Sequence, residues 1–392
     1  MPPKKIALFS GEIPSTTFIE RLITGLAQDG FYIYLFGTRH KKVSYSNTIF
    51  QFSYSATKIG KLTTLIKYTV LLQLFKPSDK KKLDKIIASN KGNTLLQKTN
   101  YYPVLYHKPD IFHLQWGKGI ANWIWVQDFG IKIILSLRGT QITISPIANA
   151  NLTADYLTYF PRVNGFHAVS NSIKREAINY GADSSKIKVI YSGLDTEKLP
   201  FLSRSVQNEK LEIVSVGRSH WVKGYTYALD AFSQLKNENF NFQYTIIGIE
   251  NDEELVFQSA QLELGSTVLF QPNQSFQNVV NAIQKADILL LSSVEEGIAN
   301  VVLEAMALGT IVLSTDCGGM DEVLVDGENG FLVPIRNSKA IAQKIKLISG
   351  LSEDEKQLIR IKARATIVSQ HSFDRMILEM KELYTTVLNI AD

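Results

Sequence analysis

Cysteine is almost absent from this sequence of 392 residues, with Cys317 as the single example. One cysteine excludes an intramolecular disulfide and a zinc site made of several thiolates, and it is typical of a reducing compartment. Long apolar runs are also missing. None approaches the roughly 20 residues of a membrane-spanning helix, and residues 6–9 are too short for the core of a signal peptide. We therefore expect a cytoplasmic protein whose only membrane contact is peripheral.

Two ligand-binding motifs are missing as well. Neither half of the chain opens with the G-x-G-x-x-G turn of dinucleotide-dependent oxidoreductases, which disfavours that class. No D-x-D motif follows a predicted strand, so we expect no essential metal and no other cofactor. The net charge of +5 is modest and no recognition motif accompanies it, so we expect no nucleic acid partner.

The apolar pattern predicts an α/β protein. Short apolar runs alternate with helical patterns such as residues 18–28 and 173–180, which is typical of parallel sheets covered by helices on both faces. The predicted strands are residues 5–9, 32–36, 49–52, 111–114, 132–137, 165–169, 188–191, 211–216, 244–249, 267–270, 288–291, 310–314 and 331–333. A linker is predicted at 199–210. We expect two Rossmann-like domains facing a central cleft, residues 1–199 and 200–372, and a helix within 373–392 that packs back toward the first.

Lysines gather in one segment of the chain. Eleven lie between Lys58 and Lys108, against only Asp79 and Asp84. Residues 58–76 mix lysines with an apolar face, which favours an amphipathic helix lying on an anionic membrane surface. The alternative is a core helix followed by a solvated, lysine-rich turn, and the sequence leaves both open.

Ligands of open α/β sheets bind beyond the carboxyl ends of the strands, and VSVGRSHWVKG lies at such a place. It puts Gly217 at a strand end, with Arg218 and Lys223 near the start of the next helix. Arginine grips a phosphate through two donors and lysine adds a compact charge, so the pair suits a diphosphate. The alternative is two surface cations on a loop.

SVEEGIANVVLEAMALG carries two carboxylates, Glu296 and Glu304, where a strand feeds a helix. Gly297 permits close approach of the backbone, and Asn300 is the expected N-cap. Free N–H groups around Asn300 and Val301 would then face an anion. Glu304, one turn into the helix, suits a ribose diol, and Glu296 suits sugar hydroxyls. The alternative is a helix with incidental acids, which is less favoured because Glu304 has apolar neighbours.

Three residues of the N-terminal half are weaker candidates. Gly11 in FSGEIPSTTFIERL lies in a predicted strand-to-helix turn that loosely resembles a phosphate loop. Arg138 in LSLRGTQITISP and His113 in DIFHLQWG lie at strand ends and are candidates for the acceptor or sugar side. The alternatives are a turn glycine, an ion pair with a neighbouring acid, and a histidine that completes packing.

Together, GRSHWVKG, EGIANVVLEAMA and STDCGGMDEVLVDGENGFLVP resemble the C-terminal signature of the retaining GT-B glycosyltransferases of family 4. SGEIPSTTFI, LSLRGTQI and FHAVSNSIKREAINYGADSSKIKVIYSGLDTEKL are similar to the acceptor-side half of the same family. Several members with the P-S-T-x-F-I opening assemble surface polysaccharides. The resemblance implies metal-independent transfer of a sugar, with retention, from a nucleoside diphosphate donor to a glycan or lipid-linked acceptor. UDP is the favoured nucleotide, with GDP as the alternative.

The resemblance also implies roles for residues. Arg218 and Lys223 would bind the diphosphate and stabilise the leaving group, Glu304 would bind the ribose, and Glu296 would contact the transferred sugar. With Glu296, Arg218 and Lys223 taken as catalytic, the expected donor-binding residues are Gly11, Gly217, Arg218, Lys223, Phe270, Glu296, Gly297, Ile298, Ala299, Asn300, Val301 and Glu304.

The chain departs from the family pattern at Arg138. Many members have histidine in an S-x-H-G motif, where this chain has arginine, so a histidine contact to the sugar is not carried over. The EGIAN loop also lacks the phenylalanine and glycine of the common EGFG form. Two other functions stay open. A nucleotide-sugar epimerase would turn over without an acceptor, and a non-catalytic binding module would bind the donor without turnover.

Overall fold

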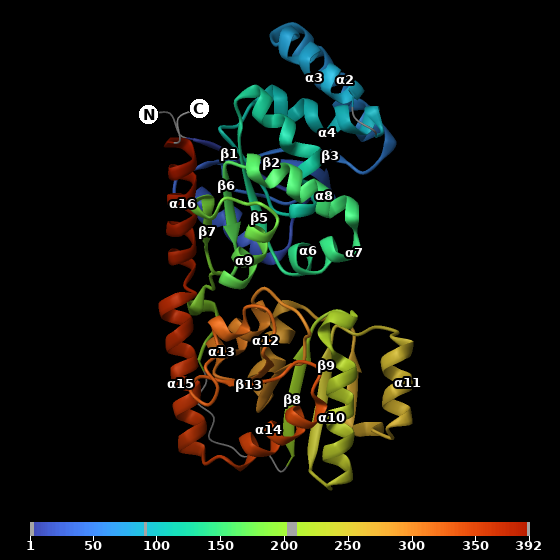
Figure 1. Ribbon diagram of the computed structural model, residues 1–392, viewed down its shortest axis with the longest axis vertical. Coiled ribbons are helices and arrows are strands. Elements are labelled where there is room, and N and C mark those ends of the chain that lie inside the picture. The colour runs from blue at the N-terminus through green and yellow to red at the C-terminus, as the bar shows by residue number, and fades with distance from the viewer. Residues whose placement is uncertain (1–3, 90–91, 202–209, 390–392) are drawn as a thin grey trace. The chain divides into compact units, whose positions relative to one another are not determined.

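The computed structural model describes residues 4–89, 92–201 and 210–389 (Figure 1). These form two compact units. The first comprises the chain up to Val169, Lys174–Ile190 and the residues from Met376 onwards, and the second comprises Ser170–Ile173 and Tyr191–Arg375. The main division therefore falls at Tyr191, nine residues before the boundary that the sequence predicts. Residues 202–209 of the predicted linker lie outside the described residues.

The first unit is built on a sheet of seven parallel strands, in the order β3-β2-β1-β4-β5-β6-β7. Its strands are β1 Lys5–Ile13, β2 Tyr32–Arg39, β3 Ile49–Ser55, β4 Ile111–Leu114, β5 Lys132–Leu137, β6 Gly165–Ala168 and β7 Ile187–Val189. The interior strands β4 and β6 are buried at every residue, as expected for a parallel sheet covered on both faces. All seven predicted strands are confirmed, most of them to within a few residues.

Helices cover this sheet. They are α1 Thr17–Gln28, α2 Lys58–Phe75, α3 Pro77–Ser89, α4 Thr94–His107, α5 Ile120–Trp123, α6 Thr140–Thr143, α7 Ser145–Ala148, α8 Ala150–Tyr159, α9 Asn171–Asn179 and α16 Phe373–Asn389. The C-terminal helix α16 packs against the sheet. The hydroxyl of Tyr384 lies 2.8 Å from the ring of His113 in β4. Gly165 in β6 passes so close to α16 that a Cβ there would lie 2.6 Å from Val387.

The lysine-rich segment forms two helices, α2 and α3, and not a helix followed by a turn. Helix α2 buries only Tyr68 and Leu72. Figure 1 shows α2 and α3 standing out from the rest of their unit. The side chains of α2 that are more than half exposed include Ile59, Leu62, Ile66, Val70, Leu74 and Phe75. The expectation of a core helix is therefore wrong, because most of the apolar surface of α2 faces outward. No helix within the described ranges is long and apolar enough to cross a bilayer.

The second unit has six parallel strands in the order β10-β9-β8-β11-β12-β13. Its elements are β8 Leu211–Val216, α10 Tyr225–Asn237, β9 Phe242–Ile247, α11 Glu253–Gln261, β10 Val268–Gln271, α12 Phe276–Lys285, β11 Ile288–Leu291, α13 Asn300–Leu308, β12 Ile311–Thr315, β13 Phe331–Val333, α14 Ser338–Gly350 and α15 Glu353–Gln370. Leu290 joins the core of one face, with α10 and α14, whereas Leu289 and Leu291 join the other, with α13 and α15. Both faces are covered, as the sequence predicts.

Candidate active site

The loop after β8 is held in one shape by contacts that require glycine. A Cβ on Gly217 would lie 2.8 Å from the hydroxyl of Tyr225, which donates a 3.1 Å hydrogen bond to the Gly217 carbonyl. Gly224 has φ +60°, and a Cβ there would lie 2.2 Å from the Ser292 carbonyl oxygen. One turn of 3₁₀ helix, Trp221–Lys223, connects the two glycines. The loop therefore presents Arg218, which is exposed, and Lys223, which is partly buried.

Lys223 and Glu296 meet although 73 positions separate them in the chain. The Lys223 ammonium donates to Glu296 Oε1 at 2.6 Å, and the Ser293 hydroxyl donates to the same oxygen at 3.0 Å. The two side chains are only 20% and 17% exposed, so water screens their charges weakly. The Ser292 hydroxyl also donates to the Lys223 carbonyl at 2.9 Å, which joins the two loops. The structure thus brings a predicted phosphate ligand and a predicted sugar ligand into one ion pair.

Two adjacent glycines brace the loop that carries Glu296. Gly318 has φ +60°, and a Cβ on it would lie 1.6 Å from the Glu296 carbonyl oxygen. The N–H of Gly319 donates to the Gly297 carbonyl at 2.9 Å. The sequence prediction assigned no role to either residue, although the Gly-Gly pair in STDCGGMDE was a signal of close backbone approach.

Helix α13 begins at Asn300, and Ala299 occupies its N-cap position. The prediction of Asn300 as the cap is therefore wrong, and no side chain caps the helix. The first N–H groups of α13, those of Asn300 and Val301, have no partner within the helix and carry its positive dipole end. Glu304 is partly buried one turn further on, between buried residues on either side. The Glu296 loop leads directly into this helix end, through Gly297, Ile298 and Ala299.

Phe270 lies in strand β10 and packs against the core of its face. The residues that form the loop after this strand begin at Pro272, which is exposed. Phe270 is one of the predicted donor-binding residues. The side chain is partly buried against this core, and its contact with the donor stays a prediction.

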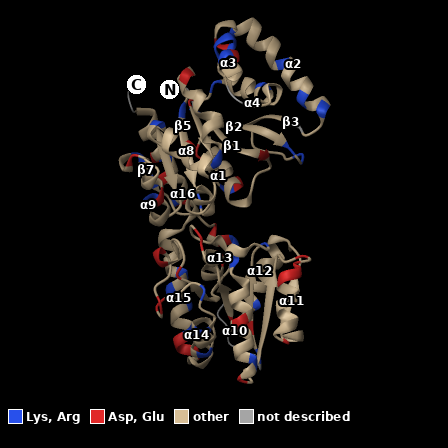
Figure 2. Cartoon of the chain, turned by 45° about the vertical axis from the view of Figure 1, so that its right-hand side comes forward, with Lys and Arg blue, Asp and Glu red and all other residues tan. Residues whose placement is uncertain are grey.

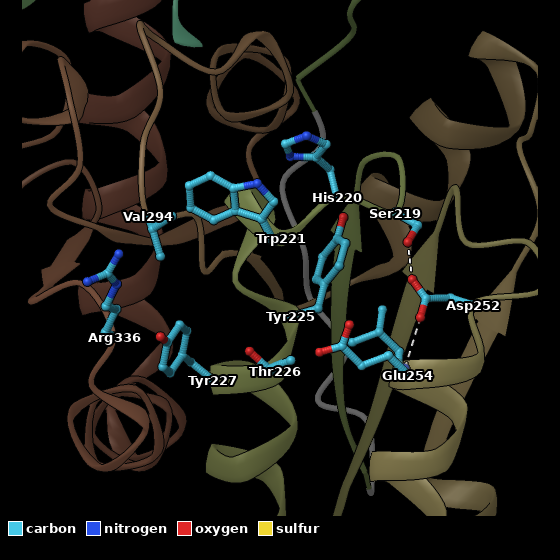
Figure 3. A pocket seen from close by; sticks show the side chains of 11 residues that line it. Ser219, His220, Trp221, Tyr225, Thr226, Tyr227, Asp252, Glu254, Val294 and Arg336 are labelled. Carbon is cyan, nitrogen blue, oxygen red and sulfur yellow. Dashed lines mark hydrogen bonds between the residues drawn. The ribbon is translucent and has the colours of Figure 1, made fainter. Parts of the chain in front are cut away.

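A hollow of about 200 Å³ lies beside the Arg218 loop, at the start of α10 and α11 (Figure 3). Ser219 donates a hydrogen bond to Asp252 across one side of it. Its lining is made of Ser219, His220, Trp221, Tyr225, Thr226, Tyr227, Asp252, Glu254, Leu255, Val294 and Arg336. None of the predicted site residues lines this hollow.

Cys317 lies close to the Glu296 loop but is not a candidate nucleophile. Its side chain is buried. Burial, with a smaller contribution from the carboxylates of Glu296 and Glu295, raises the pKa of the thiol to about 12. The thiol is therefore protonated at neutral pH and chemically inert.

His113 and Gly11, in the first unit, have structural roles in the described residues. His113 is completely buried, with its ring nitrogens 2.8 Å from Tyr384 Oη and 2.8 Å from Ser136 Oγ. Burial lowers the pKa of this histidine well below its usual value, and the charge of Arg138 acts in the same direction. The burial and the two partners favour the alternative that this histidine completes packing. Strand β1 does not end before Gly11 but continues to Ile13. Gly11 therefore lies inside the strand, at a bulge, with φ +91°.

Arg138 follows β5 directly and is partly buried. Its guanidinium donates to Gln115 Oε1 at 3.2 Å and lies 4.6 Å from the centre of the Phe18 ring. Burial lowers the pKa of Arg138 to about 10. The alternative of an ion pair with a neighbouring acid is wrong for the part of the chain that the structure describes, where no carboxylate pairs with Arg138. The same part contains no group of three or more His, Cys, Asp or Glu side chains placed to hold a metal ion.

Comparison with protein families gives two matches that follow one another along the chain. The family model described as Glycosyltransferase Family 4 matches residues 15–198, and the one described as Glycosyl transferases group 1 matches residues 201–365. Together they span almost the whole chain, including both of the loops that meet at Lys223 and Glu296.

Individual glycosyltransferases are similar to most of the chain. The chain is 28% identical over 284 residues to WcaL of Escherichia coli K12, named for colanic acid biosynthesis, with 69% of this chain and 68% of the relative covered. It is 26% identical over 294 residues to the amylovoran biosynthesis glycosyltransferase AmsK of Erwinia amylovora, with 70% of each chain covered.

Solved structures of similar fold cover 98% or more of the chain. A glycosyltransferase of Rickettsia africae has a TM-score of 0.73 at 18% identity and covers 100% of both chains. HepE of Anabaena, solved with UDP, has a TM-score of 0.70 at 16% identity and covers 98% of this chain and 100% of its own. At such identity these likenesses describe the fold alone. With the family models they lead to one conclusion: the chain is a glycosyltransferase of family 4 with the GT-B fold.

Proposed function

We propose that the protein transfers a sugar from a UDP-sugar to a glycan or lipid-linked acceptor, with retention of anomeric configuration, in the assembly of a surface polysaccharide. The observation that carries this proposal is the Lys223–Glu296 pair, 2.6 Å apart and next to the N-terminus of α13. The names of WcaL and AmsK support the polysaccharide, and the UDP bound to HepE supports the nucleotide.

In the proposed mechanism the bond between the anomeric carbon and the phosphate oxygen breaks, and its electron pair stays on the diphosphate. Arg218, Lys223 and the N-terminus of α13 stabilise the negative charge that develops there. The acceptor hydroxyl forms the new bond on the same face of the sugar, and its proton passes to the departing phosphate oxygen. These groups supply the charge that a metal would otherwise supply, so we propose that no metal is essential.

Glu296 is assigned a positioning role toward the transferred sugar and not a nucleophilic one. Its Oε1 accepts hydrogen bonds from Lys223 and Ser293, which stabilise the carboxylate and make that oxygen a poorer nucleophile. Glu304 is assigned to the ribose hydroxyls, because it follows the helix N-terminus by one turn.

A donor screen tests the proposed function. UDP- and GDP-sugars are offered with and without glycan and lipid-linked acceptors, and nucleotide release and sugar products are both recorded. We expect UDP release that requires an acceptor, an α-linked product from an α-linked donor, and no loss of rate in EDTA. Turnover without acceptor and with an altered sugar would favour an epimerase, and binding without turnover would favour a binding module.

We also propose that helices α2 and α3, together called the α2–α3 hairpin, hold the protein on the anionic inner face of the membrane. Six apolar side chains of α2, from Ile59 to Phe75, are 51% to 75% exposed. The exposed lysines of the hairpin that form no ion pair with a described residue include Lys58, Lys67, Lys81 and Lys85, and Figure 2 shows the basic residues of both helices in blue. Apolar side chains flanked by lysines fit an interface of acyl chains and anionic headgroups.

Replacing Ile66 and Leu74 with glutamate is expected to weaken sedimentation with phosphatidylglycerol vesicles about tenfold or more, because both side chains would enter the acyl boundary. Leu358 and Ile361 of α15 are also at least half exposed, so the same pair of substitutions there is the matched control. Replacing the four unpaired lysines with glutamine is expected to weaken binding to anionic vesicles only. Unchanged sedimentation of the α2 variant, or a dimer of the parent that this variant abolishes, would overturn the proposal.

A further inference from the structure

Arg138 is a cation without an anion. Among the described residues its partners are the Gln115 side-chain oxygen at 3.2 Å and the face of Phe18 at 4.6 Å. Neither partner carries a negative charge, and no ion pair of the described chain includes Arg138. A partly buried charge that lacks a counter-charge is costly for the folded protein. Such a residue is retained more readily when a ligand supplies the missing charge.

Two hydrogen-bond donors at this position also lack an acceptor. They are Arg138 Nε and Gln115 Nε2, both buried and without a partner in the described structure. Gln115 is completely buried. Exchanging its amide oxygen and nitrogen does not solve the problem, because the amide N–H groups would then face the guanidinium. Both unpaired groups are donors, so the ligand that completes the cluster must be an acceptor.

The residues behind Arg138 do not compensate its charge. His113 and His167 are buried, and Ser136 lies between them with its hydroxyl 2.8 and 2.9 Å from the two rings. Burial, with a smaller contribution from the charge of Arg138, lowers the pKa of His167 to about 3. These histidines are therefore neutral at physiological pH and leave the guanidinium as the one charge of the cluster.

We infer that Arg138 and Gln115 bind an anionic group of a substrate, a carboxylate or a phosphate, in the first unit. The inference depends on the proposed function only in taking this anion as part of a transferase substrate. Two substrates carry such a group: an acidic sugar, through its carboxylate, and a lipid-linked acceptor, through its phosphate.

The arginine also determines the kind of substrate that this position selects. The guanidinium presents a planar array of donors that matches the two oxygens of a carboxylate or phosphate. We therefore expect this chain to prefer a charged substrate group over its uncharged analogue.

Calorimetric titration without donor tests the inference with two matched pairs of probes. Methyl glucuronide is compared with methyl glucoside, and farnesyl diphosphate with farnesol. The parent is expected to bind the charged member of one pair about tenfold to a hundredfold more tightly than its uncharged analogue. The pair that shows the difference identifies the source of the anion. Arg138→Gln is expected to abolish the difference, and Arg138→Lys to keep part of it.

The control is Arg162→Gln, because Arg162 also lies over an aromatic ring, that of Tyr159 at 5.9 Å, but is exposed. It is expected to bind all probes as the parent does. Thermal unfolding of Arg138→Gln is expected at the same or a higher temperature than the parent, so lost binding would not reflect lost folding. Equal binding of both members of each pair by the parent, or an unchanged preference in Arg138→Gln, would overturn the inference. UDP binding, measured separately, tests the proposed function independently.

Discussion

Replacing Lys223 with alanine is expected to lower kcat of sugar transfer by about 10²- to 10³-fold, the loss seen when one preorganised donor to a developing anion is removed. The reason is its position. The ammonium lies 2.6 Å from Glu296 at the end of a loop held by Gly217 and Gly224, where the departing diphosphate is proposed to bind. Steady-state nucleotide release measures the effect.

Lys344→Ala is the matched control for this substitution. Lys344 belongs to the same unit, has the same exposed fraction of 20%, and pairs with Asp326 at 3.0 Å. It is expected to leave kcat unchanged. A second variant, Lys223→Ala with Glu296→Gln, removes the unpaired carboxylate as well. It should regain stability lost by the single variant but not its turnover. Parental kcat in Lys223→Ala would refute the assignment of the diphosphate.

Gly318→Ala is expected to reduce activity by about 100-fold or more, although residue 318 carries no functional group. An added Cβ would lie 1.6 Å from the Glu296 carbonyl oxygen, so the loop that carries this carboxylate must move. Displacement of a catalytic group by about 1 Å costs about 10²-fold in rate. Alanine at positive φ adds strain of about 1 kcal/mol. Turnover and thermal unfolding are measured together.

Gly327→Ala separates the effect of backbone strain from the effect of displacing the Glu296 loop. Gly327 also has positive φ, +77°, but no atom lies within 4 Å of its added Cβ. It is expected to lose about 1 kcal/mol of stability and to retain parental activity. If Gly318→Ala behaved in the same way, the bracing of the Glu296 loop by residues 318 and 319 would have no part in catalysis.

Where the prediction from sequence fails, a long-range contact outweighs a local preference. Asparagine at position 300 favours an N-cap by about 1 kcal/mol. The helix nevertheless begins at Asn300, with Ala299 in the cap position. The preceding loop is tied to Gly319 through the 2.9 Å hydrogen bond to the Gly297 carbonyl, and this tie lies in a segment 22 positions away. Packing likewise decides which way Phe270 and His113 face.

The lysine-rich segment shows a second limit of prediction from sequence. Its charges and apolar residues are visible in the sequence, but periodicity does not tell which apolar face is covered. The structure shows that Tyr68 and Leu72 face the domain. The exposed apolar side chains of α2 do not, and these are Ile59, Leu62, Ile66, Val70, Leu74 and Phe75. It also shows that Lys80 is paired with Asp84 at 2.9 Å, so this lysine is less available to a membrane than Lys81 or Lys85.

The sequence alone determined the two parallel sheets, the strand ends at which the predicted phosphate and sugar ligands lie, and the family. Strand periodicity, strand-end glycines and charged pairs are local properties, which a single chain displays without its fold. Only the tertiary structure decided that Lys223 and Glu296 form one ion pair, that Gly318 braces their loop, and that Arg138 has no acid beside it. These facts depend on packing between segments far apart in the chain, and no local pattern encodes such contacts.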